Sequence, residues 1–213
     1  MDQIWDGIFQ INRGFFYTAK ELSLRPGTTI RHILEGHRVQ HFKPLSFLIL
    51  CTTIYVLANY LLGHDTFLND FFVGFQSGAE ENEKQTSQSE IFEWIGNNQV
   101  YSYLILIPIF SIASFLGFHK SGYNYVEHLV INLYIGGIQM LIYFLFSLIV
   151  HIHSDLVTIP LLLGFAFNIW SYFQIFQNLS TTRKILLLFL TYLFYALLFT
   201  GLFTFVLLFT IEK

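Results

Sequence analysis

Residues 128–150 read HLVINLYIGGIQMLIYFLFSLIV, a run without Asp, Glu, Lys or Arg. A helix needs roughly 17–25 apolar residues to cross the hydrocarbon core of a bilayer. Four further runs have a similar length. We therefore expect spans at residues 45–62, 100–118, 128–150, 156–176 and 185–211. This pattern predicts an all-α fold, a polytopic transmembrane helical bundle of about five spans with interfacial helices at its N-terminus.

The composition excludes a soluble globular protein. The 213 residues are 54% hydrophobic and 19% aromatic but only 12% charged, whereas soluble domains are about one quarter charged. Such a chain has too few polar groups to cover a water-exposed surface. The single cysteine, Cys51, also excludes an intramolecular disulfide framework and a zinc site made of several cysteines.

The basic residues predict the orientation of the bundle. Most of them fall on one side of a five-span topology: Arg13, Lys20, Arg25, Arg31, Arg38, Lys43, Lys120, Arg183 and Lys184. The other side carries Lys84, within the acidic 63–99 loop, and the terminal Lys213. By the positive-inside rule we expect an inner-membrane protein with a cytoplasmic N-terminus and an extracytoplasmic C-terminus.

Residues 1–44 predict a cytoplasmic, basic segment that lies against the membrane. Apolar residues recur at helical spacing over 2–22, Pro26-Gly27 breaks the chain, and a second short helix follows to about His37. Four basic residues are candidates for binding anionic lipid headgroups: Arg25, Arg31, Arg38 and Lys43. The alternative is that these charges only fix the topology.

A polar set in the 128–150 span is the second candidate site: Glu127, His128, Asn132 and Gln139. Because polar groups in a span are costly unless they face the bundle interior or water, we expect this set to face inward. It can join helices by hydrogen bonds, line a conduction or substrate path, or place Glu127 and His128 as acid and base. Consecutive helical residues point about 100° apart, which argues against the catalytic role.

Metal and cofactor sites are not predicted. His32, His37 and His41 lie close in sequence, as do His151 and His153, but neither group has the further ligands that zinc requires. Phosphate-loop, dinucleotide, nucleophile-elbow and zinc-protease motifs are missing from the sequence. We expect membrane lipids as partners and no nucleic acid.

Several motifs resemble one family of bacterial integral membrane proteins, frequent in Bacteroidetes, whose function is uncharacterised. They are Arg13-Gly14-Phe15, Leu24-Arg25-Pro26-Gly27, Leu34-Glu35-Gly36-His37-Arg38, Phe42-Lys43-Pro44-Leu45, and the later run Tyr125-Val126-Glu127-His128-Leu129-Val130. Many relatives begin with a cysteine-rich zinc ribbon, which this chain lacks. The resemblance implies a membrane protein and no particular activity.

The sequence therefore favours a non-enzymatic channel or permease-like protein, or an accessory subunit, that contacts anionic lipid. Five spans make a narrow bundle, so a pore would form between copies of the chain or with another membrane protein. One alternative is an intramembrane lipid-modifying enzyme that uses Glu127 and His128. Another is an accessory or effector of a defence operon.

Overall fold

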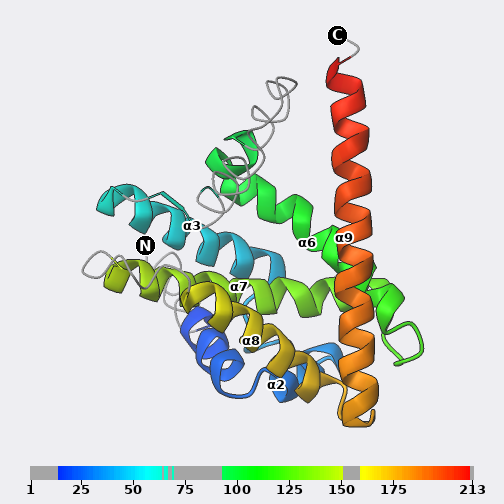
Figure 1. The fold of residues 1–213 in the computed structure, drawn as a ribbon. Helices are drawn as coiled ribbons and strands as arrows, with labels where there is room; N and C mark the ends of the chain where they lie inside the picture. Colours follow the sequence, from blue (N-terminus) through cyan, green and yellow to red (C-terminus); the bar gives the residue numbers. More distant parts are fainter. Residues whose placement is uncertain (1–13, 64, 67–68, 70–92, 151–158, 212–213) are drawn as a thin grey trace.

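The computed structural model describes the chain except residues 1–13, 64, 67–68, 70–92, 151–158 and 212–213. The described part consists of helices and contains no strand, which confirms the predicted all-α class. Residues 14–24 are helical and precede the six labelled helices of Figure 1. These are α2 (Pro26–Leu34), α3 (Pro44–Leu62), α6 (Gln99–Gly117), α7 (Tyr125–Val150), α8 (Ile159–Ile175) and α9 (Thr181–Ile211).

Four of these helices are long and apolar enough to cross a membrane, namely α3, α6, α7 and α9. They cover four of the five predicted spans and support a multi-pass membrane protein. The fifth prediction, 156–176, corresponds to α8, which has 17 residues. At 1.5 Å per residue α8 is about 26 Å long, shorter than the hydrocarbon core of about 30 Å. Residues 156–158 and the centre of the 63–99 loop lie outside the described residues.

Helices α3 and α7 pack side by side at the centre of the bundle (Figure 1). Two adjacent glycines of α7, Gly136 and Gly137, allow the neighbouring helices to approach it closely. A Cβ on Gly137 would lie 2.5 Å from the Phe47 ring, and one on Gly136 would lie 2.9 Å from Ile107 of α6. Small residues let membrane helices approach closely, so this pair brings α3 and α6 onto the same part of α7.

The N-terminal segment is part of the same core. Phe15, Leu22, Ile30 and Ile33 are buried in one cluster with side chains of α3, α7 and α8. The apolar face predicted over 2–22 thus packs, in its described portion, against the bundle. Residues 1–13 of that predicted helix lie outside the described part.

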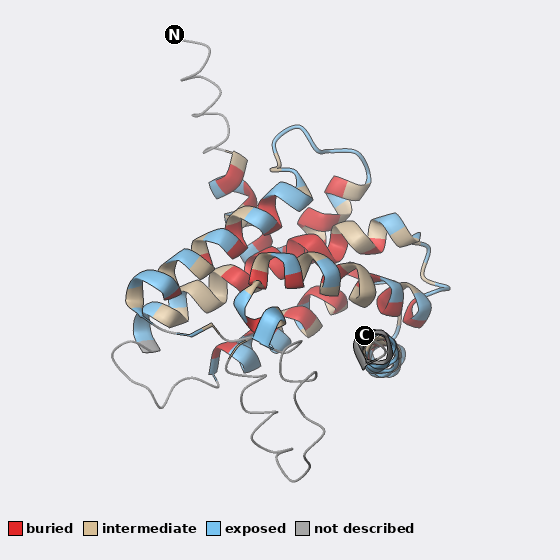
Figure 2. Ribbon diagram, turned by 90° about the horizontal axis from the view of Figure 1, so that it is seen from above, coloured by how far each residue is buried: buried red, intermediate tan, exposed pale blue. Residues whose placement is uncertain are grey.

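Helix α9 crosses the other helices steeply and does not run alongside them. Figure 1 shows it standing across α7, and Figure 2 shows it end-on at the edge of the molecule, away from the buried centre. It packs mainly on α6, where a Cβ on Gly117 would overlap the Thr191 hydroxyl. Two helices that cross steeply cannot both follow the membrane normal, so the predicted spans do not form a parallel set.

Candidate functional site

One end of the bundle carries the α6–α7 connection, the α8–α9 connection and α2. The topology predicted from the sequence would place it in the cytoplasm, and it is named the inner end after that prediction. Two contacts of α2 bring it to the end of α8. The backbone N–H of Gly27 donates to Oε1 of Gln174 at 3.1 Å, and Nη1 of Arg31 donates to the carbonyl oxygen of Gln174. The charge pattern predicted that the basic residues of these segments lie on one side of the membrane. In the structure, α2, the α6–α7 connection and the α8–α9 connection lie at the same end of the bundle.

Arg31 and Lys184 both donate hydrogen bonds to backbone carbonyl oxygens in the last turn of α8. Nη1 of Arg31 also reaches the carbonyl oxygen of Ile175 at 3.5 Å, and Nζ of Lys184 donates to that of Phe173 at 3.0 Å. The last carbonyls of a helix have no partners within it, and the helix dipole makes this end negative. Two cations from different parts of the chain therefore cap α8.

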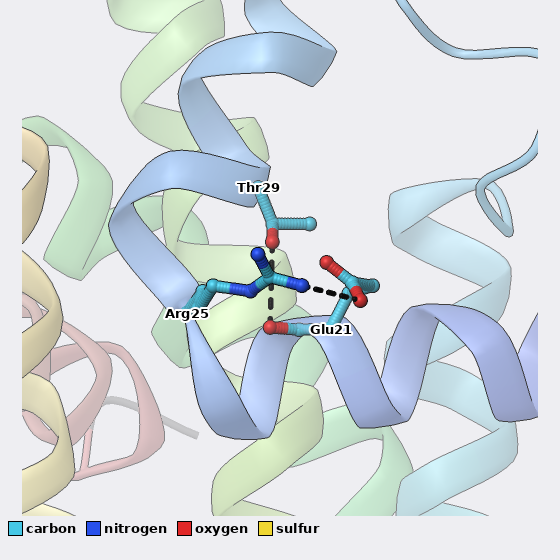
Figure 3. Close-up of polar contacts among 3 residues, drawn as sticks. All are labelled: Glu21, Arg25 and Thr29. Carbon is cyan, nitrogen blue, oxygen red and sulfur yellow. Dashed lines mark hydrogen bonds and ion pairs between the residues drawn. The ribbon is translucent and has the colours of Figure 1, made fainter.

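The other three residues predicted to bind lipid headgroups, Arg25, Arg38 and Lys43, make different contacts within the protein. Nη2 of Arg25 pairs with Glu21 at 3.2 Å, one turn earlier, and the Thr29 hydroxyl donates to the Glu21 carbonyl oxygen at 3.3 Å (Figure 3). Nε of Arg38 donates to the carbonyl oxygen of Ile33 at 3.1 Å. Lys43 immediately precedes α3. The binding of lipid headgroups by this set stays a prediction.

Glu127 closes a capping box at the start of α7. Its carboxylate accepts the N–H of Asn124 at 2.7 Å, and the Asn124 side-chain oxygen accepts the N–H of Glu127 at 3.0 Å. This reciprocal pair satisfies two backbone donors that a helix start leaves open. Within the described residues, Glu127 forms no ion pair with Arg25 or Arg31.

Tyr123 lies where the N-terminal segment approaches the predicted polar set. Burial raises its pKa above the ordinary value of 10, the charge of Arg31 lowers it, and Glu127 raises it. Its ring centroid is 5.6 Å from that of Phe176 and 6.5 Å from that of His128. Tyr123 therefore sits between the α8 cap and the start of α7.

Asn132 is the centre of a buried hydrogen-bond network that joins three helices. Its amide nitrogen donates to the hydroxyls of Ser111 and Ser114 on α6, both at 3.1 Å. Its carbonyl oxygen accepts from the Tyr172 hydroxyl of α8 at 2.8 Å. All polar atoms of the Asn132 side chain are thus in use. The network ties α6, α7 and α8 together in the buried part of the bundle.

His128 joins this network through one ring nitrogen, and its imidazole ring packs against aromatic side chains. Nδ1 lies 2.9 Å from the Ser114 hydroxyl, while Nε2 is buried and has no hydrogen-bond partner among the described residues. The ring lies between Phe115 and Phe176, each 6.0 Å away between centroids. Which of the two donates in the contact between His128 and Ser114 depends on the tautomer of the imidazole ring.

The bundle also contains a cavity of about 570 Å³ between α6, α7, α8 and α9. Two of the four predicted polar residues, Asn132 and Gln139, line it; Glu127 and His128 do not. The further lining residues are mostly aliphatic and aromatic: Tyr103, Leu106, Ile107, Phe110, Ile135, Gly136, Tyr143, Leu161, Leu162, Phe165, Asn168, Tyr192 and Tyr195.

The sequence had indicated part of this arrangement. His128 and Asn132 were expected to face inward, and they are buried. Ser111, Ser114 and Tyr172 were missed because hydroxyls are common in spans and carry no motif. The spacing Asn124-x-x-Glu127 was a usable signal for the capping box. Within the described residues, no three His, Cys, Asp or Glu side chains are grouped to hold a metal ion.

Comparison with known proteins adds one family. Residues 12–56 match the model of a family described as Protein of unknown function (DUF3667). That stretch contains the N-terminal motifs, the Gly27 and Arg31 contacts, and most of α3. No curated protein and no solved structure matches the chain. Over this stretch the chain is therefore similar to an uncharacterised domain family.

Proposed function

We propose that this chain is a non-enzymatic integral membrane protein that binds a neutral amphiphile in the cavity between α6, α7, α8 and α9. The observation that carries the proposal is the character of this cavity. Its volume of about 570 Å³ falls in the range of roughly 300–1,000 Å³ typical of small-molecule sites. Its wall is largely apolar, with a few amides and hydroxyls.

Two amides offer hydrogen bonds to a bound molecule. Asn168 accepts from the Tyr192 hydroxyl at 2.9 Å, and Gln139 donates to the carbonyl oxygen of Gly164 at 2.8 Å. Each amide thus uses one of its two polar atoms. Within the described residues, Nδ2 of Asn168 and Oε1 of Gln139 have no hydrogen-bond partner, which leaves one donor and one acceptor.

The lining predicts a ligand without charge. Among the residues that the structure describes, no Asp, Glu, Lys, Arg or His lines the cavity. Moving a charged headgroup into such surroundings costs several kcal/mol without a counter-charge. A molecule with a hydroxyl or carbonyl group and a hydrocarbon portion fits the wall, and such molecules partition into bilayers.

The cavity lining and the contacts of Glu127 and His128 also bear on the alternative functions predicted from the sequence, which are an enzyme, a permease and a defence accessory. Neither Glu127 nor His128 lines the cavity, and both are engaged at the start of α7. A lipid-modifying enzyme built on this pair therefore gains no support. A permease-like role remains compatible, because a permease also needs a binding cavity. The role in a defence operon stays a prediction from sequence.

The test is to identify the lipid that co-purifies with the protein. In Leu161→Trp, a larger side chain enters the cavity wall; in Leu197→Trp, the same change is made on α9 at a residue that does not line it. We expect wild type and Leu197→Trp to retain a neutral amphiphile near one per chain by lipid mass spectrometry, and Leu161→Trp to lose it. Equal amounts in all three samples would contradict the proposal.

A further inference from the structure

We propose that a second pocket, at the inner end, binds the phosphate group of an anionic ligand. This inference is independent of the apolar cavity. The pocket has a volume of about 190 Å³ and lies between the α6–α7 connection and the start of α9. That volume is several times the roughly 30 Å³ of one water molecule. His119, Lys120, Ser121 and Arg183 line it above an apolar floor.

The charges of this pocket are not balanced by the protein. Within the described part of the chain, no carboxylate lines it, and neither Lys120 nor Arg183 forms an ion pair or a hydrogen bond. Two neighbouring cations repel each other, so a bound anion gains from both charges. Arg25, by comparison, already has Glu21 as its partner.

The position of Arg183 also needs an explanation outside its own helix. It lies in the first turn of α9, where the helix dipole disfavours a cation. The adjacent Lys184 is explained by its bond to the carbonyl oxygen of Phe173 and by its place over the Phe173 ring. Arg183 has no such contact and lines the pocket instead. Its charge, together with that of Lys120, makes the pocket attractive to an anion.

The pocket floor indicates how a lipid would lie. Three leucines form it: Leu116, Leu179 and Leu187. The neighbouring surface of α9 is also apolar, with Leu186 exposed at 60% and Phe189 at 71%. Basic pockets between membrane helices bind phospholipid headgroups elsewhere. A lipid phosphate and a free phosphate share the required chemistry, and the experiment separates them.

The experiment measures ligand binding to the full-length, delipidated protein in detergent by microscale thermophoresis. The ligands are short-chain phosphatidylglycerol, short-chain phosphatidylcholine and inorganic phosphate. The variants are Lys120→Ala, Arg183→Ala, the double variant, and Lys20→Ala as a control that removes an exposed cation outside the pocket. Arg183→Lys, which keeps the charge, checks that a loss does not come from misfolding.

We expect wild type to bind phosphatidylglycerol more tightly than phosphatidylcholine. The affinity for phosphatidylglycerol should fall about fivefold in each single alanine variant and about 25-fold in the double variant. Arg183→Lys and Lys20→Ala should bind like wild type. Competition by millimolar inorganic phosphate would identify free phosphate as the ligand, and its failure to compete would identify the lipid headgroup. Unchanged binding in the double variant, an equal loss in Lys20→Ala, or equal binding of phosphatidylcholine would overturn the proposal.

Discussion

Gly27 lies directly against Gln174, a residue 147 positions later in the chain. Its backbone N–H donates to the Gln174 side chain at 3.1 Å, and a Cβ at this position would lie 2.5 Å from the Gln174 carbonyl carbon. The contact fixes the N-terminal segment to the end of α8. It gives a structural reason for the Pro26-Gly27 pair: proline begins α2, and glycine lets it reach α8.

Gly27→Ala should lower stability by about 1–3 kcal/mol, because the added methyl group meets backbone atoms that must move. Thermal unfolding in detergent, followed by the loss of the monodisperse peak in size-exclusion chromatography, measures this. Gly201→Ala is the matched control, since a Cβ there meets nothing within 4 Å. It should leave stability unchanged or raise it slightly. Equal melting temperatures for wild type and Gly27→Ala would refute the contact.

Arg31→Ala should be much more damaging than Arg25→Ala. Arg31 caps backbone carbonyls of α8, and hydrogen bonds from charged groups contribute about 1.5–3 kcal/mol. Arg25 forms an exposed pair with Glu21, and such pairs contribute about 0–1 kcal/mol. The same unfolding assay compares the two variants. If both changed stability equally, capping of α8 by Arg31 would not be its main role.

Asn132→Leu should destabilise the bundle more than His128→Phe. Asn132 loses three hydrogen bonds, which at about 0.6 kcal/mol each in membrane proteins amounts to about 2 kcal/mol. His128→Phe loses one, and the new ring keeps the aromatic neighbours. Thermal unfolding of both variants in the same detergent gives the comparison. A larger loss for His128→Phe would place the centre of the network at His128.

Acidification should weaken the N-terminal segment through His41. Its pKa is lowered from the ordinary value of 6.5, mainly by burial and also by the charge of His32, while Glu21 partly offsets the shift. The unfolded chain therefore takes up a proton before the folded protein does. Stability is full above about pH 6.5 and falls as the pH drops below it. Melting temperatures at pH 7.5 and 5.5 should differ less for His41→Phe than for wild type. An identical difference in both proteins would rule out His41 as the cause.

The helical class and most apolar helices could be predicted from sequence because long apolar runs have one stable solution in a bilayer. The segment around Pro160 was harder. Asn168 and Gln174 dilute its apolar pattern, and the described helix α8 is shorter than the others. The steep crossing of α9 was out of reach. It depends on Gly117 admitting Thr191, a contact between segments that no local pattern relates.

For the site, the sequence located polar residues without showing what they contact. Spacing put His128 and Asn132 on one face, but their partners Ser114 and Tyr172 come from two other helices. Charge indicated that Arg31 lies at the inner end, yet only the fold shows it bonded to α8. The apolar cavity is a property of four helices together and has no signature in any one of them.

Occupancy of the cavity by a neutral amphiphile can be measured directly in the membrane. The direct measurement uses a photoactivatable diacylglycerol analogue, with a diazirine in its acyl chain, and the protein reconstituted in vesicles. After illumination, mass spectrometry of peptides locates the label. We expect labelling of cavity residues such as Phe165 and Tyr192, reduced in Leu161→Trp and unchanged in Leu197→Trp. Labelling confined to exposed residues outside the cavity, such as Ile112 and Leu197, would contradict it.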